Sequence, residues 1–232
     1  MLDILKIALP VVLIGLGLLY FFQDALIFYP PPTSPENRKQ FESHAYRVTH
    51  AGTDLRGWFV RGKVSADRPL LVYYGGNAEE VSDNLWDLSR FAAGAYLFIN
   101  YRGYGGSDGE PTEAALFADA LALFDHVAPR HAALDLIGRS LGSGVAVYLA
   151  SQRGVDRVAL VTPYDSVLAV ARALYPLYPV DWLLKDRFES VRYAAEVRAP
   201  VQLLVAGHDR VIPPVHAERL AGAFEQTDAT AV

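Results

Sequence analysis

The stretch Gly138-Arg139-Ser140-Leu141-Gly142 decides the fold of this chain. It follows a short apolar run, Leu134–Ile137, and opens a helical pattern, Leu141–Ser151. A serine between two glycines in a strand–turn–helix setting is typical of a nucleophile held at the end of a sheet. Side chains at 138 and 142 would collide with a neighbouring strand or helix, and glycine removes them. The pattern predicts that Ser140 is a nucleophile on a strained turn.

Short apolar runs alternate with helical patterns on both sides of this turn. The segment 55–60 alternates at period two and predicts an early antiparallel strand. Further runs end in Gly, Asn, Pro or Asp, as doubly buried parallel strands do: Leu70–Tyr74, Ala95–Asn100, Leu134–Ile137, Val158–Val161 and Val201–Ala206. Helical patterns lie between them: Glu79–Phe91, Thr112–Val127, Leu141–Ser151 and Asp165–Leu174. The alternation predicts an α/β fold, a mostly parallel sheet with helices on both faces, and ligands bind such sheets at the carboxyl ends of the strands.

Composition narrows the functional classes. Of the 232 residues, 52% are hydrophobic and 20% charged, which predicts a folded chain with an ample core. The net charge of −5 and the lack of a Lys/Arg cluster argue against a nucleic-acid partner. With no cysteine in the sequence, disulfides, zinc–thiolate sites and a cysteine nucleophile are excluded. We expect no metal and no cofactor.

The N-terminus is apolar. From Ile7 to Phe22 there is no charged residue, and at about 1.5 Å per residue this run, lengthened by Ile4 and Leu5, nearly spans a hydrocarbon core of about 30 Å. It predicts a single transmembrane helix; a cleaved signal peptide is the alternative, although no small-residue cleavage site follows. Because Lys6 makes the N-terminal flank the more positive one, the domain is expected on the non-cytoplasmic side.

Several motifs together resemble a known group, the membrane-anchored α/β hydrolases related to the BEM46 and ABHD17-like serine hydrolases. Each motif alone is only suggestive, and their order and spacing carry the resemblance. They are the segment from Gln23 to Pro30, Tyr74-Gly75-Gly76-Asn77-Ala78-Glu79, Asn100-Tyr101-Arg102-Gly103-Tyr104-Gly105-Gly106-Ser107, Gly138-Arg139-Ser140-Leu141-Gly142, Thr162-Pro163-Tyr164-Asp165-Ser166 and Gly207-His208-Asp209-Arg210-Val211-Ile212-Pro213. Many members have His where this chain has Gly75, and Asp where it has Asn100.

The resemblance implies an α/β-hydrolase fold over residues 41–232, preceded by a membrane anchor over 1–29 and a Pro-rich linker over 30–40. It also implies cleavage of an ester, thioester or amide through an acyl-enzyme on Ser140. The substrate would be an acyl-type small molecule, a lipid or an acylated protein, with the lipid bilayer as a second partner. In this layout the backbone N–H groups of Leu141 and Asn77 form the oxyanion hole. A plain turn with Asn77 as a helix cap is the alternative for that loop.

The acid of a catalytic triad is expected in the loop after the last long strand. Asp209 follows the run Val201–Ala206 on a glycine-containing turn, which suits a carboxylate that orients a histidine. The rival is Asp165, which also follows a strand, although there a helix-capping role is sufficient.

A histidine base is harder to place. In this fold the order along the chain is Ser, acid, His, and the printed sequence ends at Val232, where the next strand would be forming. His216 is the one histidine after Asp209, and its helical pattern favours a surface residue. The domain is therefore expected to be C-terminally incomplete, with the last strand lacking and the chain nearly inactive. The alternative is a catalytically silent protein or fragment that binds a ligand or partner in the same pocket.

An aromatic segment, Leu174–Arg192, lies between two strands at the expected active-site end. Its aromatic residues are Tyr175, Tyr178, Trp182 and Phe188. They predict either a short lid with an acyl-binding face or simple packing.

Overall fold

One sheet organises the molecule. The computed structural model describes residues 2–62, 68–90 and 93–232, without the side chains of 2–5, 7–9, 12, 89 and 90. The strands are β1 (Ala45–His50), β2 (Thr53–Arg61), β3 (Leu70–Tyr74), β4 (Ala95–Ile99), β5 (Leu134–Arg139), β6 (Arg157–Val161), β7 (Val201–Leu204) and β8 (Ala229–Ala231). Their order is β1-β2-β4-β3-β5-β6-β7-β8. The pairs β1–β2 and β2–β4 are antiparallel and the others parallel, which confirms the predicted mostly parallel sheet.

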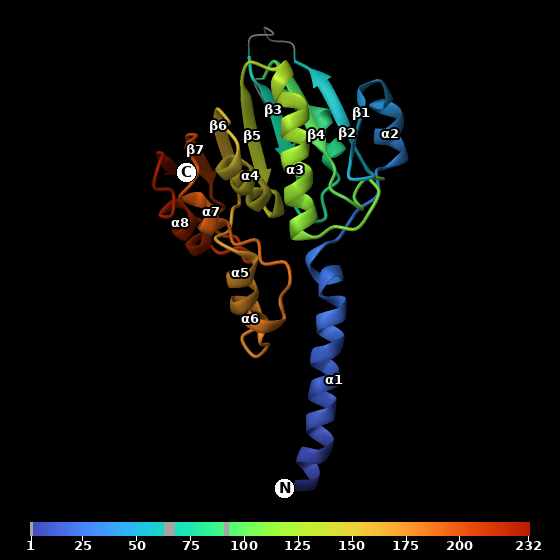
Figure 1. Cartoon of the computed structure of the whole chain (residues 1–232), viewed down its shortest axis with the longest axis vertical. Coiled ribbons are helices and arrows are strands. Elements are labelled where there is room, and N and C mark those ends of the chain that lie inside the picture. Colours follow the sequence, from blue (N-terminus) through green and yellow to red (C-terminus); the bar gives the residue numbers. More distant parts are fainter. Residues whose placement is uncertain (1, 63–67, 91–92) are drawn as a thin grey trace.

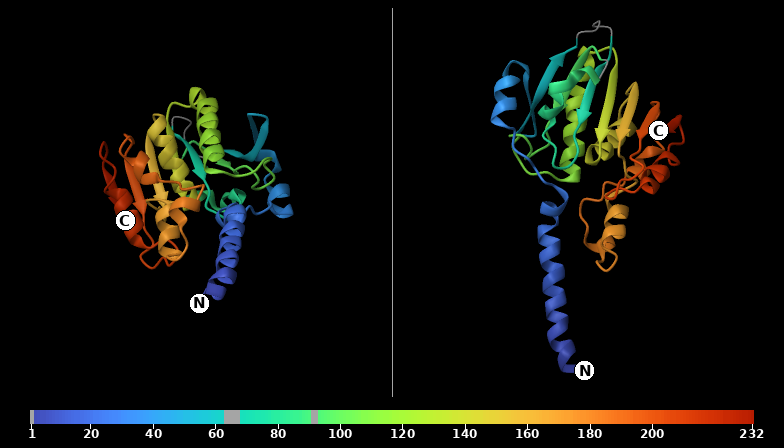
Figure 2. Two further views of the ribbon diagram at one scale, coloured as in Figure 1. Left: turned by 60° about the horizontal axis from the view of Figure 1, so that its bottom comes forward. Right: turned by 180° about the vertical axis from the view of Figure 1, so that it is seen from behind.

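Helices cover both faces of this sheet (Figures 1 and 2). The α-helices are α1 (Leu2–Ile27), α2 (Pro35–Gln40), α3 (Glu113–Val127), α4 (Leu141–Gln152), α5 (Val167–Leu174), α6 (Val180–Leu183), α7 (Ser190–Ala194) and α8 (Pro214–Ala221). Three 3₁₀ segments are η1 (Glu42–His44), η2 (Val81–Arg90) and η3 (Ala128–Arg130). Among these, α3 and α4 pack on one face of the sheet, and η2 packs on the other.

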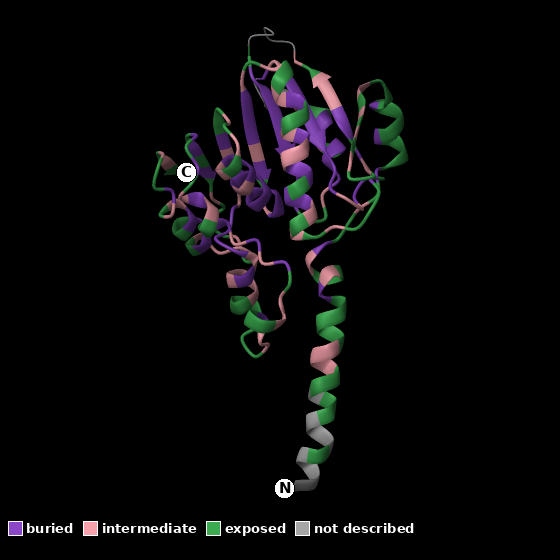
Figure 3. Ribbon diagram, viewed as in Figure 1, coloured by how far each residue is buried: buried purple, intermediate pink, exposed green. Residues whose placement is uncertain are grey.

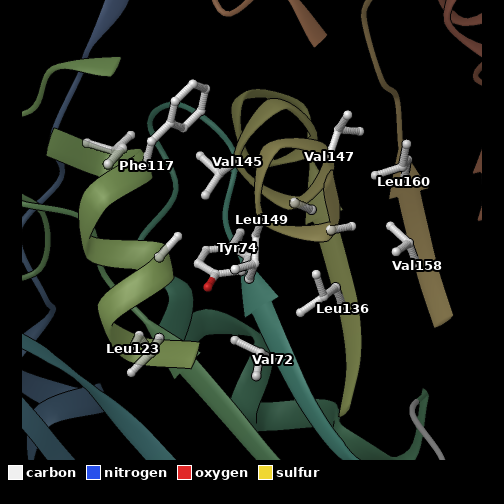
Figure 4. Packing of buried hydrophobic residues seen from close by; sticks show 14 of the residues in the cluster. Val72, Tyr74, Phe117, Leu123, Leu136, Val145, Val147, Leu149, Val158 and Leu160 are labelled. Atoms are coloured by element: carbon white, nitrogen blue, oxygen red, sulfur yellow. The ribbon is translucent and has the colours of Figure 1, made fainter. Parts of the chain in front are cut away.

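Strand β3 shows why the core has two halves. All five of its residues are buried, and alternate side chains point to opposite faces. Val72 and Tyr74 pack with α3 and α4, as Figure 4 shows, whereas Leu71 and Tyr73 pack with η2. A strand buried on both faces reads as a continuous apolar run, which explains why the sequence revealed it so clearly.

Helix α1 extends away from the carboxyl ends of the parallel strands (Figure 1). Most of its described residues are exposed (Figure 3). Among its apolar side chains, Phe21 is 75% exposed. Across the described residues, the structure contains no helix whose length and apolarity suit a membrane span. The predicted helix is thus present, but a membrane span is not seen, and part of the predicted span, at 7–9 and 12, lies outside the described side chains.

The strand that was expected to be lacking is present. β8 is short, yet it pairs in parallel with β7 along Ala229–Ala231. The backbone N–H of Val232 also donates to the carbonyl of Leu203 at 2.8 Å. The sequence places the beginning of this strand at the end of the printed chain, and the structure shows that these three residues already pair with β7.

The prediction of a regular helix over Glu79–Phe91 is wrong. Residues Val81–Arg90 form 3₁₀ turns that break at Asp87, where φ is −139° and ψ is 72°; Phe91 lies outside the described residues. Polar side chains in this segment bind the backbone instead of extending a helix: the Asn84 amide donates to the carbonyl of Val81 at 3.3 Å.

The proline-rich segment lies against the domain. The Thr33 hydroxyl is buried and donates to the carbonyl of Gly105 at 2.7 Å. Further on, α2 begins after Ser34, whose hydroxyl accepts from the N–H of Asn37 at 3.0 Å. The Asn37 side chain is buried in turn and donates to the hydroxyl of Ser82 at 2.9 Å. These contacts hold the segment from Thr33 to Asn37 against the domain.

Candidate active site

Ser140 lies on the tight turn that the sequence predicts. It joins β5 to α4 with φ of 49° and ψ of −115°, a conformation that costs a non-glycine residue strain. A Cβ on Gly138 would lie 2.3 Å from the carbonyl oxygen of Gly142, and one on Gly142 would lie 2.1 Å from that of Tyr74. Both glycines are therefore required for the close approach of α4 to the sheet.

Two backbone N–H groups belong to residues that line the same cavities as Ser140 or follow it in the chain. Leu141 is the first residue of α4, so its N–H is among those that a helix leaves unpaired. Asn77 follows β3 in the adjacent loop. Within the described part of the chain, no hydrogen bond is recorded from the N–H of either residue. Free N–H groups beside a serine suit a developing anion, which the helix dipole also favours.

The side chain of Asn77 has a role that the sequence did not suggest. Its amide donates to the carbonyl of Ile27 at 2.6 Å, and its carbonyl oxygen accepts from the N–H of Tyr29 at 2.8 Å. The hydroxyl of Tyr104 donates to the same oxygen at 2.9 Å. Burial raises the pKa of Tyr104 to about 12, so this hydroxyl remains a donor at neutral pH. Asn77 thus ties the end of α1 to the candidate oxyanion loop.

Ser140 lines two cavities of different character. One, of about 340 Å³, is lined almost entirely by apolar side chains from α1, the segment Val167–Leu184 and the loop at Val211 and Ile212. The other, of about 640 Å³, is polar and contains Glu79, Arg139 and Asp209. Arg139 lies 3.2 Å from the Glu79 carboxylate. An apolar acyl group of an ester would fit the first cavity, and a polar leaving group would fit the second.

Asp209 lies in the polar cavity together with Ser140. One of its carboxylate oxygens accepts from the N–H groups of Val211 and Ile212, at 2.8 and 2.9 Å. Those two bonds fix the carboxylate on its turn and leave the other oxygen without a recorded partner among the described residues. The structure therefore brings the predicted acid and nucleophile to one cavity.

His216 is buried, contrary to the sequence prediction of a surface residue. It is 3% exposed, and its Nδ1 lies 2.7 Å from the carboxylate of Asp165. Arg219 approaches the same carboxylate at 3.5 Å. The rival acid Asp165 is thus engaged in joining α8 to the end of β6, while Ser166 caps α5 by accepting from the N–H of Ala169 at 2.9 Å. In the described residues no histidine hydrogen-bonds the Ser140 hydroxyl, and no group of three or more His, Asp or Glu side chains is arranged to hold a metal ion.

The aromatic segment divides between the two predicted roles. Tyr175 and Tyr178 line the apolar cavity, as an acyl-binding face would require. Phe188 is fully buried in the main core, whereas Trp182 is 87% exposed and lines neither cavity.

The structure explains why this chain has Asn100 where many members of the resembled family have Asp. Its side-chain amide donates to the carboxylate of Glu80 at 2.8 Å, and both residues are buried. An aspartate would place a second carboxylate against Glu80, and like charges in a buried site repel strongly. The amide replaces that repulsion with a hydrogen bond.

The strand order and the serine turn define an α/β hydrolase. Comparisons with known proteins agree, although no family model matches the chain. An uncharacterised protein of Mycobacterium tuberculosis, Rv2307c, is 33% identical over 93% of this chain and 83% of its own length. Protein bem46 of Schizosaccharomyces pombe is 26% identical over 89% and 76%, and the α/β hydrolase domain-containing protein WAV2 of Arabidopsis thaliana is 24% identical over 90% and 78%. The chain belongs to this BEM46-related family of α/β hydrolases.

Solved structures share the fold. Est1E from Butyrivibrio proteoclasticus, determined with ferulic acid bound, superposes with a TM-score of 0.66 at 15% identity, over 81% of this chain and 89% of that one. Mouse α/β hydrolase domain-containing protein 10 superposes with a TM-score of 0.62 at 17% identity, over 81% and 87%. At these identities the likeness concerns the fold alone.

Proposed function

We propose that this chain is a serine hydrolase that cleaves an ester, thioester or amide through an acyl-enzyme on Ser140. One observation carries the proposal: Ser140 occupies a strained turn, at φ of 49°, and lines both an apolar and a polar cavity. A merely structural serine gains nothing from that conformation, whereas a nucleophile gains exposure to both halves of a substrate.

The reaction follows from this placement. The Ser140 oxygen bonds to the acyl carbon and gives its proton to a base, and the carbonyl oxygen becomes an anion that the N–H groups of Leu141 and Asn77 bind. The bond to the leaving oxygen, sulfur or nitrogen then breaks, and the leaving atom takes the proton. Water releases the acid in a second, equivalent step. Each oxyanion donor is worth about 10²–10³ in turnover.

No histidine among the described residues is placed to act as the general base for Ser140. His216 binds Asp165, and this favours the second candidate function, a silent hydrolase-fold protein that binds a ligand at the same cavities. We propose that Ser140 in the printed chain reacts slowly and is not catalytically silent. Asp209 would orient an imidazole that enters the polar cavity. General-base help is worth about 10²–10⁴ in rate.

A fluorophosphonate probe tests this proposal. The serine oxygen displaces fluoride from phosphorus, so labelling reports the nucleophile directly. We expect slow labelling of the full chain, with the adduct on Ser140, and a rise of at least about tenfold in added imidazole, within the usual range of base catalysis. Asp209→Asn should remove most of that rise. A chain that remains unlabelled in imidazole would instead establish the silent candidate.

We also propose that α1 holds the domain on a lipid bilayer, on its non-cytoplasmic side. The exposed apolar side chains of α1, among them Leu13, Ile14, Phe21 and Phe22, support it, because such a surface is costly in water. The full chain is expected to sediment with membranes and to resist an alkaline carbonate wash. Release of the intact chain by that wash would contradict the proposal.

A further inference from the structure

Helix α1 contacts the domain through side-chain hydrogen bonds in addition to the covalent connection at its end. Gln23 is 6% exposed, and its amide donates to the carbonyl of Leu183 at 3.0 Å while its oxygen accepts from the N–H of Lys185 at 2.8 Å. The Lys185 ammonium lies 3.7 Å from the carboxylate of Asp24 and 4.7 Å from the ring centroid of Tyr20. These two hydrogen bonds of a buried side chain fix the orientation of α1 against the end of α6 and the residues that follow it.

A second set of hydrogen bonds lies one turn further along. There the Asn77 side chain binds the carbonyl of Ile27 and the N–H of Tyr29. Gln23 and Asn77, which make these bonds, both line the apolar cavity. α1 supplies Leu19, Leu26 and Ile27 to its wall, and the α5 side supplies aliphatic side chains opposite. Without α1 the cavity would lose one wall.

The chemistry of the cavity selects its occupant. Its lining is aliphatic and aromatic, and the amide of Gln23 already has partners on both its nitrogen and its oxygen. No charged side chain lines it among the described residues, so a headgroup would be desolvated there without a partner. Ser140 lines this cavity and also the polar one.

We propose that α1 is one wall of a binding site for a single long acyl chain, which lies between α1 and the α5–α6 segment with its carboxyl end at Ser140. This acyl-chain site would hold the substrate of the proposed hydrolase, and the position of the carboxyl end at Ser140 rests on that proposed function. Leu19 is eight residues before the junction at Ile27, so it contacts the distal part of the chain, and short acyl groups do not reach it. Each methylene buried should strengthen binding roughly fourfold.

Because the sequence has no cysteine, single thiols can report the site. Leu19→Cys places a thiol on the cavity wall, and Leu18→Cys places one on the same helix, 53% exposed in the native residue and outside the lining. Both variants, made in the 232-residue chain that also carries Ser140→Ala, are placed in phosphatidylcholine nanodiscs and treated with a membrane-permeant maleimide. The Ser140→Ala background makes the result independent of turnover.

Dodecanoate at ten times its dissociation constant is expected to slow maleimide reaction of Leu19→Cys about tenfold and to leave Leu18→Cys unchanged. Butyrate should protect neither. Equal protection of both thiols, or of neither, would overturn the proposal, because fatty acid in the bilayer would shield both alike. If dodecanoate protects Leu19→Cys alone while the chain with its native Ser140 shows no labelling by fluorophosphonate, the acyl site stands and the hydrolase proposal fails.

Discussion

Ser140→Ala is expected to abolish fluorophosphonate labelling of the chain at every imidazole concentration. The alanine retains the elbow, since Ala is smaller than Ser and meets no new atom there, but it has no oxygen to bond to phosphorus. In a serine hydrolase with a complete triad, loss of the nucleophile costs on the order of 10⁶ in turnover; in this chain, where no histidine among the described residues bonds to Ser140, the loss of turnover is smaller and labelling is the main readout. Labelling should therefore fall to background, and hydrolysis of a nitrophenyl ester to the level of oxyanion-hole and binding effects.

Ser151→Ala is the matched control. It lies near the end of the same helix, where its hydroxyl donates to the carbonyl of Tyr148 at 2.7 Å, and it lines neither cavity. This variant should be labelled at the parental rate. Persistent labelling of Ser140→Ala would assign the nucleophile to another residue and would remove the basis of the proposed function.

The sequence predicted those parts of the fold that local patterns determine. β3 and β4 are buried on both faces, so they appear as unbroken apolar runs, and the turn at Ser140 is defined by glycines two residues away on either side. Such signals need no knowledge of distant partners. The short β8 has no periodicity of useful length, whereas η2 has a helical pattern that breaks at Asp87, where polar side chains nearby bind the backbone instead.

The sequence predicted which strand ends carry the candidate site residues, but not the long-range contacts around them. Ser140, Leu141, Asn77 and Asp209 follow strand ends, where this architecture gathers functional groups. The long-range contacts were missed. His216 looked like a surface residue because its partner Asp165 lies 51 positions earlier, and the Gln23 bonds span 160 and 162 positions. A pattern read along one helix cannot reveal which side of it another segment will cover.

Gly142→Ala is expected to lower the stability of the domain markedly and to disrupt the serine turn. The added Cβ would lie 2.1 Å from the carbonyl oxygen of Tyr74 and 2.7 Å from that of Gly75. β3 cannot retreat, because it is buried throughout and is hydrogen-bonded to β4 and β5. α4 must therefore move, and Ser140 moves with it. Overpacking of this kind costs about 1–3 kcal/mol, and backbone contacts lie towards the upper end.

Gly154→Ala provides the comparison, because a Cβ at that position meets no atom within 4 Å. Its change in the free energy of unfolding should stay within about 0.5 kcal/mol, as for most surface substitutions. Urea denaturation of the two variants measures the difference, and fluorophosphonate labelling below the transition reports the turn. Gly142→Ala should unfold at lower urea and label poorly although Ser140 is intact. If both variants unfold at the parental midpoint, α4 does not approach β3 as closely as described, and the glycine at 142 must serve another purpose than close packing.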